Sequence, residues 1–334
     1  MPSNSKDASH VAEADRRRFF AAVFAHGSAR ILSKAASAPL ERIKICLQVA
    51  SLPPAVPLTA SGSGCAKTLF IDILAHQGTN AFWRGFGAHV MGTGLGGVAR
   101  LSVLRTTQMW AMPGGDWHYH GIGAYIRRCT FLYATGSAAL LVAYPFDVAY
   151  TCLAADTSTQ RRFRGTLHFV THTYQTHGML SLYRGLPLCL ATAAPFVLVA
   201  TAVHDFLAPV LLRRRGQAPC VGDPASSGDP EWLLRDGAPV HLYPWNLWVG
   251  AVSGFAGQAV TYPLDTLRRR WQHTCTSQFK EHPATLRQCL VHIRSQGGYR
   301  VLYAGFSVNA LKLLPELWVL GSVYLTLNAS GSFV

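Results

Sequence analysis

The chain has 334 residues, of which 49% are hydrophobic and only 14% charged, and 30 basic residues against 16 acidic ones leave a formal charge of +14. A soluble domain carries about 25% charged residues, so the composition favours a membrane protein, and the positive excess fits an anionic lipid or cargo. Nucleic acid is the competing partner for this charge. We expect no nucleic-acid partner, because neither a zinc-finger spacing nor an aromatic-basic RNA motif occurs in the sequence.

The cysteines and the common catalytic motifs exclude further classes. The eight cysteines are scattered without Cys-x-x-Cys pairs, and several lie in apolar segments, where cysteine usually behaves as a small hydrophobe. Neither a disulfide framework nor a metal site is expected. The sequence contains no HExxH, GxSxG or P-loop pattern, which disfavours an enzyme and a bound cofactor.

In chain order, the first element is a polar tail, residues 1–17. It has no apolar core of the secretory type, and Asp7, Glu13 and Asp15 argue against a cleaved mitochondrial presequence. Six apolar segments follow, each long enough to cross a bilayer as a helix of about 20 residues. They are 18–48, 86–110, 123–155, 187–212, 243–273 and 306–329, with a polar, Pro/Gly-rich loop at 213–242.

A pair of motifs recurs three times. "APLERIKICLQ" (38–48), "YPFDVAYTCLA" (144–154) and "YPLDTLRRRWQ" (262–272) align without gaps, and "FWRG", "LYRG" and "LYAG" follow them in the same order. A period of roughly 110 residues indicates a repeat architecture. The repeats are 18–112, 123–212 and 243–330, and the predicted fold class is an all-α membrane protein with six transmembrane helices in three pseudo-symmetric repeats.

The first motif has a physical interpretation. A proline inside a helix frees a carbonyl and kinks the helix, so Pro39, Pro145 and Pro263 would bend three helices toward a common axis. The acid two residues after each proline and the base three further on would then point into the convergence and pair there. Alternatively, these are helix-end charges that snorkel to water. Three copies in register favour the ion-pair interpretation.

These motifs resemble the mitochondrial carrier family across essentially the whole chain. Within that family, "SKAASAPLERIK" (33–44), "LAAD" (153–156) and "DTLRRR" (265–270) are similar to the ADP/ATP carriers. One departure is that Trp271, Gln272 and His273 stand where that branch has three methionines. The resemblance implies alternating access in the mitochondrial inner membrane.

The resemblance also implies a gate facing the matrix. Its pairs would be Asp147 with Arg268, Asp265 with Lys44, and Glu41 with residue 150, with Gln48 and Gln272 hydrogen-bonded beneath them. Position 150 is Tyr150 rather than a base. We therefore expect Glu41 to receive one neutral hydrogen bond from Tyr150 and to have no cationic partner, so that the gate closes less firmly.

Carried over in the same way, the substrate-binding residues are Lys34, Arg100, Thr192, Ala193, Phe196, Thr261 and Lys312. Gly92 stands where the ADP/ATP carriers have a contact arginine, and Arg100 would substitute for it. Lys312 has a second interpretation, a local pair with Glu316. The second acid–base network of the family, at the far end, is not recognisable, since only Arg105 and Asp205 are available there.

The aromatic-basic-glycine motifs resemble cardiolipin sites of the family. They imply an anionic structural lipid at Trp83, Arg84 and Gly85 and at Tyr183, Arg184 and Gly185, whereas Ala304 replaces the base in the third copy. The sequence therefore predicts a monomeric inner-membrane carrier with both termini toward the intermembrane space that exchanges ADP for ATP. The alternatives are the same fold carrying another phosphorylated anion, such as another nucleotide, a nucleotide cofactor or phosphate, and a carrier-like protein without transport.

Overall fold

The computed structural model describes residues 4–49, 66–111, 122–158, 162–213, 244–273, 286–296 and 298–329. These residues are almost entirely helical and contain no strand, so the all-α fold is confirmed. The long helices are α1 (Asn4–Val49), α3 (Phe86–Ala111), α4 (Ile122–Ala155), α6 (Leu186–Arg213) and α7 (Pro244–His273), followed by α9 (Phe306–Leu311) and α10 (Leu313–Ala329). The expected loop at 213–242 lies almost wholly outside the described residues.

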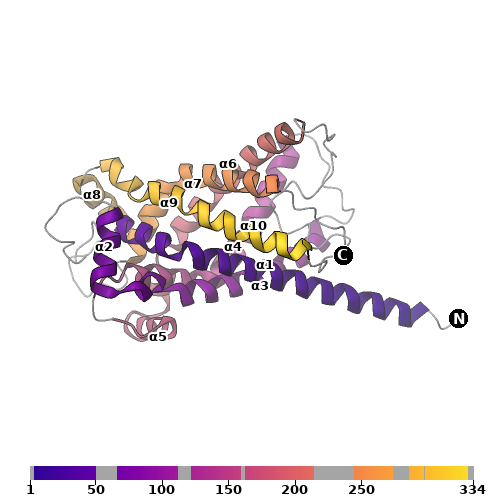
Figure 1. Ribbon diagram of the computed structural model, residues 1–334, viewed down its shortest axis with the longest axis horizontal. Helices are drawn as coiled ribbons and strands as arrows, with labels where there is room; N and C mark the ends of the chain where they lie inside the picture. The colour runs from indigo at the N-terminus through magenta and orange to yellow at the C-terminus, as the bar shows by residue number, and fades with distance from the viewer. Residues whose placement is uncertain are drawn as a thin grey trace.

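A short helix and a 3-10 turn connect the two long helices of each repeat. They are α2 (Ala66–Gln77) with η1 (Thr79–Trp83), α5 (Thr166–His177) with η2 (Met179–Tyr183), and α8 (Leu286–Gln296) with η5 (Gly298–Tyr303). Figure 1 shows α2, α5 and α8 at one end of the bundle, and the beginning of α1 and the end of α10 at the other.

Two helix boundaries differ from the expected ones. The helix α1 begins at Asn4, so most of the expected polar tail is helical. The sixth long segment is divided at Lys312 into α9 and α10. Pro315 accounts for the break, because it has no N–H to donate to the carbonyl of Leu311 four residues earlier, and its ring crowds that carbonyl.

The long helices form a closed ring. The second helix of each repeat packs against the first helix of the next, α3 on α4, α6 on α7, and α10 on α1. The helices α1, α4 and α7 also contact one another, so they line the interior of the bundle.

Glycines at the ends of the three short connections allow this close packing. Gly85, Gly185 and Gly305 have φ values of 84°, 87° and 79°, a region that residues with a Cβ rarely adopt. A Cβ on Gly185 would lie 2.9 Å from the hydroxyl oxygen of Tyr144, and one on Gly305 would lie 3.3 Å from the carbonyl oxygen of Lys44. The glycine that ends each repeated motif is therefore needed both for its backbone angle and for the contact it permits.

The three motif prolines lie inside α1, α4 and α7, as the sequence predicts. Pro39 leaves the carbonyl of Ala35 without its helical donor. The indole Nε1 of Trp83 donates to that carbonyl at 3.0 Å. One member of the aromatic-basic-glycine motif thus satisfies the backbone group that the proline frees.

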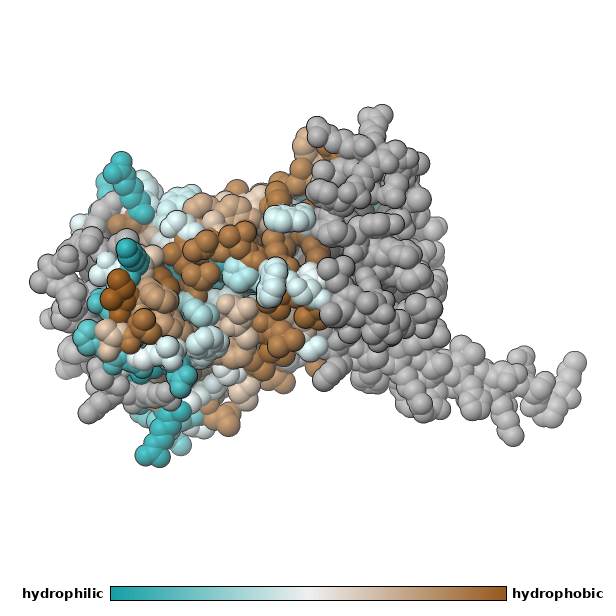
Figure 2. Space-filling model, viewed as in Figure 1, coloured by the Kyte–Doolittle hydropathy of each residue, from teal (hydrophilic) through white to brown (hydrophobic). Residues whose placement is uncertain are grey.

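The outer surface suits a bilayer. Figure 2 shows hydrophobic side chains along the middle of the bundle and hydrophilic ones toward the end that carries the short helices. By length and composition, Tyr125–Ala155 and Met179–Leu207 are each apolar enough to cross a membrane.

Candidate functional site

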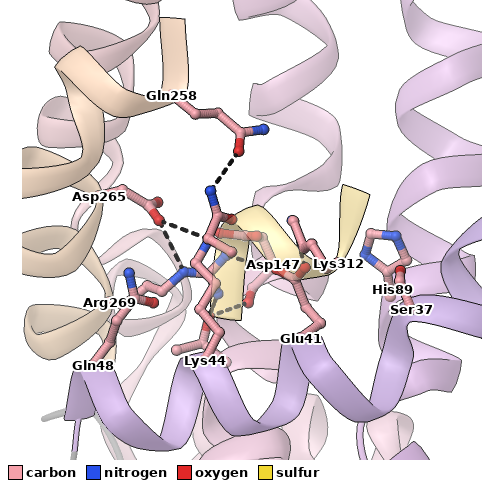
Figure 3. Close-up of polar contacts among 12 residues, drawn as sticks. Ser37, Glu41, Lys44, Gln48, His89, Asp147, Gln258, Asp265, Arg269 and Lys312 are labelled. Atoms are coloured by element: carbon pink, nitrogen blue, oxygen red, sulfur yellow. Dashed lines mark hydrogen bonds and ion pairs between the residues drawn. The ribbon is translucent and has the colours of Figure 1, made fainter. Parts of the chain in front are cut away.

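Charged and amide side chains gather where α1, α4 and α7 converge. Glu41, Lys44 and Gln48 recur at three- and four-residue spacing, which places them on one face of α1. Figure 3 shows this face pointing toward Asp147 of α4, Asp265 of α7 and Lys312 at the junction of α9 and α10. Five of these six side chains carry formal charge, so their mutual pairing decides how this end of the bundle closes.

Both acid–base pairs between different helices that the family resemblance implies are present. Arg268 Nη1 lies 3.2 Å from Asp147 Oδ2, and Lys44 Nζ lies 3.7 Å from Asp265 Oδ2. Gln272 Nε2 donates to the same Asp147 oxygen at 2.9 Å, beneath the pair as expected. These contacts join α4 to α7 and α1 to α7.

The expectation for Glu41 is wrong. Its carboxylate is not left without a cation, because Lys312 Nζ lies 2.6 Å from Oε2 and Arg269 Nη2 lies 3.6 Å from Oε1. The ring of Tyr150 packs against that of His89 at 5.2 Å, and the described contacts include no hydrogen bond from Tyr150 to Glu41. Cations from α7 and from the α9–α10 junction replace the base that α4 lacks.

Gln48 also differs from its expected position under the Lys44 pair. Its Nε2 donates to Thr266 Oγ1 at 3.1 Å, and Thr266 in turn donates to the carbonyl of Leu302 at 2.7 Å. Gln48 therefore links α1 to α7 and, through Thr266, to η5.

The three consecutive arginines of α7 point in different directions, since neighbouring residues on a helix are about 100° apart. Arg268 forms an ion pair with Asp147, while Arg269 Nε lies 3.3 Å from Asp265 Oδ2. Arg270 Nε donates to the carbonyl of Gln48 at 2.7 Å. Sequence reasoning did not assign Arg269, although its spacing of four residues from Asp265 is the signal that could have found it.

A cyclic set of contacts lies beyond the ion pairs. The side chain seven residues after each motif proline donates to the carbonyl nine residues after the proline of another repeat. The three contacts are Cys46 Sγ to Ala154 O at 3.4 Å, Cys152 Sγ to Gln272 O at 3.7 Å, and Arg270 Nε to Gln48 O at 2.7 Å. Each interior helix is thus tied to the next one, and the bundle is closed at the end that carries the short helices.

Arg42, which sequence reasoning missed, fixes the end of α4. Its side chain is fully buried. Nε donates to the carbonyl of Ala154 at 3.1 Å, and Nη2 donates to Gln77 Oε1 and to the carbonyl of Asp156, both at 2.8 Å. Such bonds between a guanidinium and carbonyls satisfy a buried cation without an acid.

Above the ion pairs lies a cavity of about 230 Å³. It is lined by Glu41, Lys44, Leu140, Cys189, Thr192, Ala193, Phe196, Gln258, Thr261, Tyr262, Asp265, Arg268, Arg269 and Lys312. Five of the seven expected substrate residues are in this set, and Lys34 and Arg100 are not. The lining carries four cations and two carboxylates, so its charge is positive.

Lys34 is engaged elsewhere. Its Nζ lies 2.6 Å from Glu316 Oε1, which also accepts from Ser37 Oγ at 2.9 Å. The alternative of a local Lys312–Glu316 pair is therefore wrong, because both residues pair across to α1 instead. Lys34 with Glu316 and Glu41 with Lys312 form two ion pairs of opposite polarity between the first and last helical segments.

At the other end of the bundle, Asp205 of α6 pairs with Arg128 of α4 at 2.9 Å. Both residues belong to the second repeat, so this pair does not link one repeat to another. The side chain of Arg105 lies outside the part of the molecule that is described.

The expected lipid motifs make protein contacts. Arg84 Nη1 donates to the carbonyls of Asp156 and Ser158 at 3.2 and 2.9 Å. The ring of Tyr183 stacks on that of Tyr144 at 6.1 Å, and the Tyr144 hydroxyl donates to the carbonyl of Arg184 at 2.9 Å. Lipid binding at these motifs stays a prediction.

Among the described residues there is no cluster of three or more metal-ligating side chains.

A closed ring of long helices in three repeats, with a positively charged cavity on its axis, defines a membrane transporter. The family model for the mitochondrial carrier protein matches residues 15–113, 125–215 and 241–329. The chain belongs to the mitochondrial carrier family, whose members are transporters of the mitochondrial inner membrane.

Curated relatives are similar over most of the chain. Solute carrier family 25 member 16 of Mus musculus is 27% identical over 92% of this chain and 88% of its own length. The probable mitochondrial adenine nucleotide transporter BTL3 of Arabidopsis thaliana is 25% identical over 90% of this chain and 66% of its own length. Mitochondrial carrier protein CoAc2 of Zea mays is 26% identical over 90% and 84%, respectively.

Proposed function

We propose that this protein exchanges ADP for ATP across the mitochondrial inner membrane by alternating access, as a monomer with both termini toward the intermembrane space. The observation that carries the proposal is the cavity, in which Lys44, Arg268, Arg269 and Lys312 converge from three helical segments. Guanidinium and ammonium groups bind phosphate oxygens through charge-assisted hydrogen bonds. The similarity to BTL3, a probable mitochondrial adenine nucleotide transporter, supports the same substrate.

The ion pairs supply a mechanism for coupling. Glu41 and Asp265 hold the lining cations when the end with the short helices is closed. A phosphate group entering the cavity would compete with these carboxylates for the same cations. Because a ligand shifts a conformational equilibrium only through its different affinity for the two states, this competition would weaken the closed state and favour opening toward the matrix.

A second candidate is the same transport cycle with another phosphorylated anion, such as another nucleotide, a nucleotide cofactor or phosphate. Gly92 occurs where a contact arginine is expected, and Lys34 is held by Glu316 outside the cavity. Both observations remove a cationic contact that the resemblance to the ADP/ATP carriers implies, and so favour an anion other than ADP. A protein without transport is the remaining alternative, since Asp205 pairs within its own repeat.

We also propose that an anionic lipid, with cardiolipin as the candidate, binds the matrix-side motifs that contain Arg84 and Arg184. Helix N-termini beside these motifs present free N–H groups to a phosphate. The helices α3 and α6 begin directly after Gly85 and Gly185, which supports this assignment.

Reconstituted transport tests the proposed function. The purified full chain is placed in liposomes loaded with ADP, and exchange is measured against external ADP, ATP, GTP, coenzyme A, phosphate and chloride. We expect exchange of ADP for ATP, with a loss of at least tenfold in the Lys312→Gln variant. The matched control is Lys67→Gln, because Lys67 is exposed on α2 and does not line the cavity. Exchange of another phosphorylated anion without ADP would select the second candidate, and no exchange of any anion would exclude both.

A further inference from the structure

An amide pair above the ion pairs is not explained by closure of the bundle. Asn309 of α9 is fully buried, and its Nδ2 donates to Gln258 Oε1 of α7 at 3.0 Å. Its Oδ1 has no hydrogen-bond partner. A buried carbonyl without a donor costs free energy that an apolar pair of similar shape would not. An apolar pair could link α7 and α9 without this loss of stability, so packing alone does not explain why the two amides are present.

Gln258 presents the free capacity of this pair to the cavity. The side chain lines the cavity. The described contacts of its carboxamide consist of the bond that Oε1 accepts from Asn309, drawn as the dashed line from Gln258 in Figure 3. A carboxamide has two N–H donors and a carbonyl oxygen that can accept two hydrogen bonds. Both donors and one acceptor position are thus available to a molecule in the cavity.

An aromatic ring lies beside this amide. A Cβ on Gly257, the neighbour of Gln258, would lie 2.9 Å from Phe196 Cδ2, so the ring packs directly against the backbone of α7. Phe196 and Gln258 both line the cavity. The neighbouring hydroxyl of Thr261 donates to the carbonyl of Gly257 at 2.9 Å and leaves the carboxamide free. One part of the wall therefore offers a flat apolar face next to adjacent donor and acceptor groups.

We propose that Gln258, held in place by Asn309, hydrogen-bonds the edge of the purine base of the transported nucleotide. The carboxamide of glutamine matches the adjacent donor and acceptor on the major-groove edge of adenine. Lys312 lies three residues after Asn309, one turn along the same helical segment. From there its ammonium group can bind the phosphates while the base is hydrogen-bonded to the Gln258 carboxamide. This inference rests on the proposed function, since it assigns the base-reading group within the proposed nucleotide site.

The test compares a ligand that has the base with one that lacks it. The variants are Gln258→Leu, Asn309→Leu and the double variant, and the ligands are ADP and inorganic pyrophosphate. Dissociation constants are measured on the purified full chain by ligand-dependent thermal stabilisation. We expect Gln258→Leu to weaken ADP binding about tenfold and to leave pyrophosphate binding unchanged. Gln288→Leu is the matched control, because Gln288 is an exposed residue of α8 and does not line the cavity.

The double variant separates recognition from packing. Replacing both amides removes the unpartnered carbonyl, so the thermal stability lost in either single variant should be regained. If Gln258 reads the base, ADP binding stays weak in this stable double variant. Recovery of ADP binding along with stability would overturn the inference, as would an equal loss of ADP and pyrophosphate. Wild-type protein that binds neither ligand would instead reject the proposed nucleotide function, and the inference with it.

Discussion

Lys312 Nζ lies 2.6 Å from Glu41 Oε2, and the two side chains are 5% and 10% exposed. The lysine stands at the break between α9 and α10, and the glutamate stands two residues after the first motif proline. The contact therefore joins the last helical segment to the first and completes the charged closure that Tyr150 cannot. It makes Lys312 both a residue of the cavity wall and a partner in the closed end.

Neutralising one partner of this pair should destabilise the protein. We expect Lys312→Met or Glu41→Gln to lower the free energy of unfolding by about 3 kcal/mol. Glu41→Gln leaves the Lys312 ammonium without its carboxylate, and Lys312→Met leaves Glu41 with only the longer contact to Arg269, at 3.6 Å. The double variant should be more stable than the sum of the single losses predicts. Thermal unfolding of the purified protein in detergent measures all three. Strictly additive losses would show that the two residues are not coupled.

The three buried tyrosines of the gate region should respond differently to loss of the hydroxyl. Tyr144 donates to the carbonyl of Arg184 at 2.9 Å, and Tyr262 donates to the carbonyl of Ala304 at 2.8 Å. We expect Tyr144→Phe and Tyr262→Phe each to cost about 1 kcal/mol. Tyr150→Phe, by contrast, should change the stability by less than about 0.5 kcal/mol. A loss in Tyr150→Phe equal to the other two would mean that its hydroxyl does reach an acceptor such as Glu41.

Two glycines of α7 form a matched pair for packing. A Cβ on Gly257 would meet Phe196 at 2.9 Å, whereas one on Gly254 would meet nothing within 4 Å. We expect Gly257→Ala to destabilise the protein by about 1–3 kcal/mol through overpacking. Gly254→Ala should be neutral or up to about 1 kcal/mol stabilising, since alanine is the better helix former. Melting temperatures compared in one buffer decide this, and equal effects at both sites would contradict the close contact of α6 with α7.

Substitution of two buried arginines, Arg42 and Arg270, should destabilise the protein to different extents. Arg42 donates to two backbone carbonyls at the end of α4 and to Gln77. Arg270 uses Nε for the carbonyl of Gln48, and its two Nη atoms have no hydrogen-bond partner. We expect Arg42→Met to cost about 3 kcal/mol and Arg270→Met about 1 kcal/mol, because the first leaves several acceptors unpaired and the second leaves one.

Unfolding free energies of both variants test this ranking. Limited proteolysis gives a second readout, since loss of Arg42 should free the segment after α4 and expose Asp156 and its neighbours. The reverse order of stabilities would show that the Nη atoms of Arg270 have a stabilising contact after all.

The sequence by itself determined the repeats, the helical segments and the expectation that acids and bases of neighbouring helices pair, because all of these follow from local spacing repeated in register. Which acid meets which base, Asp147 with Arg268 and Asp265 with Lys44, came from the resemblance to the mitochondrial carrier family. A proline, an acid two residues later and a base three further on fix their relative positions on one helix, and three copies imply three equivalent helices. The glycine that ends each connection is also a local feature, because residues with a Cβ rarely adopt its positive φ.

Only the tertiary structure decided which helices supply the remaining partners. The base missing from α4 at Tyr150 suggested that Glu41 would have a neutral hydrogen bond and no cationic partner, but a charge in the interior can be paired by any helix that reaches it. Glu41 forms ion pairs with Lys312 and Arg269, and Lys34 forms one with Glu316. Asn309 donates a hydrogen bond to Gln258. Five of these seven residues lie more than 200 positions along the chain from a partner, and only Asn309 and Gln258 lie closer. A local sequence pattern cannot predict contacts between residues so far apart in the chain. These contacts form because α10 packs against α1 and α9 packs against α7 when the ring of helices closes.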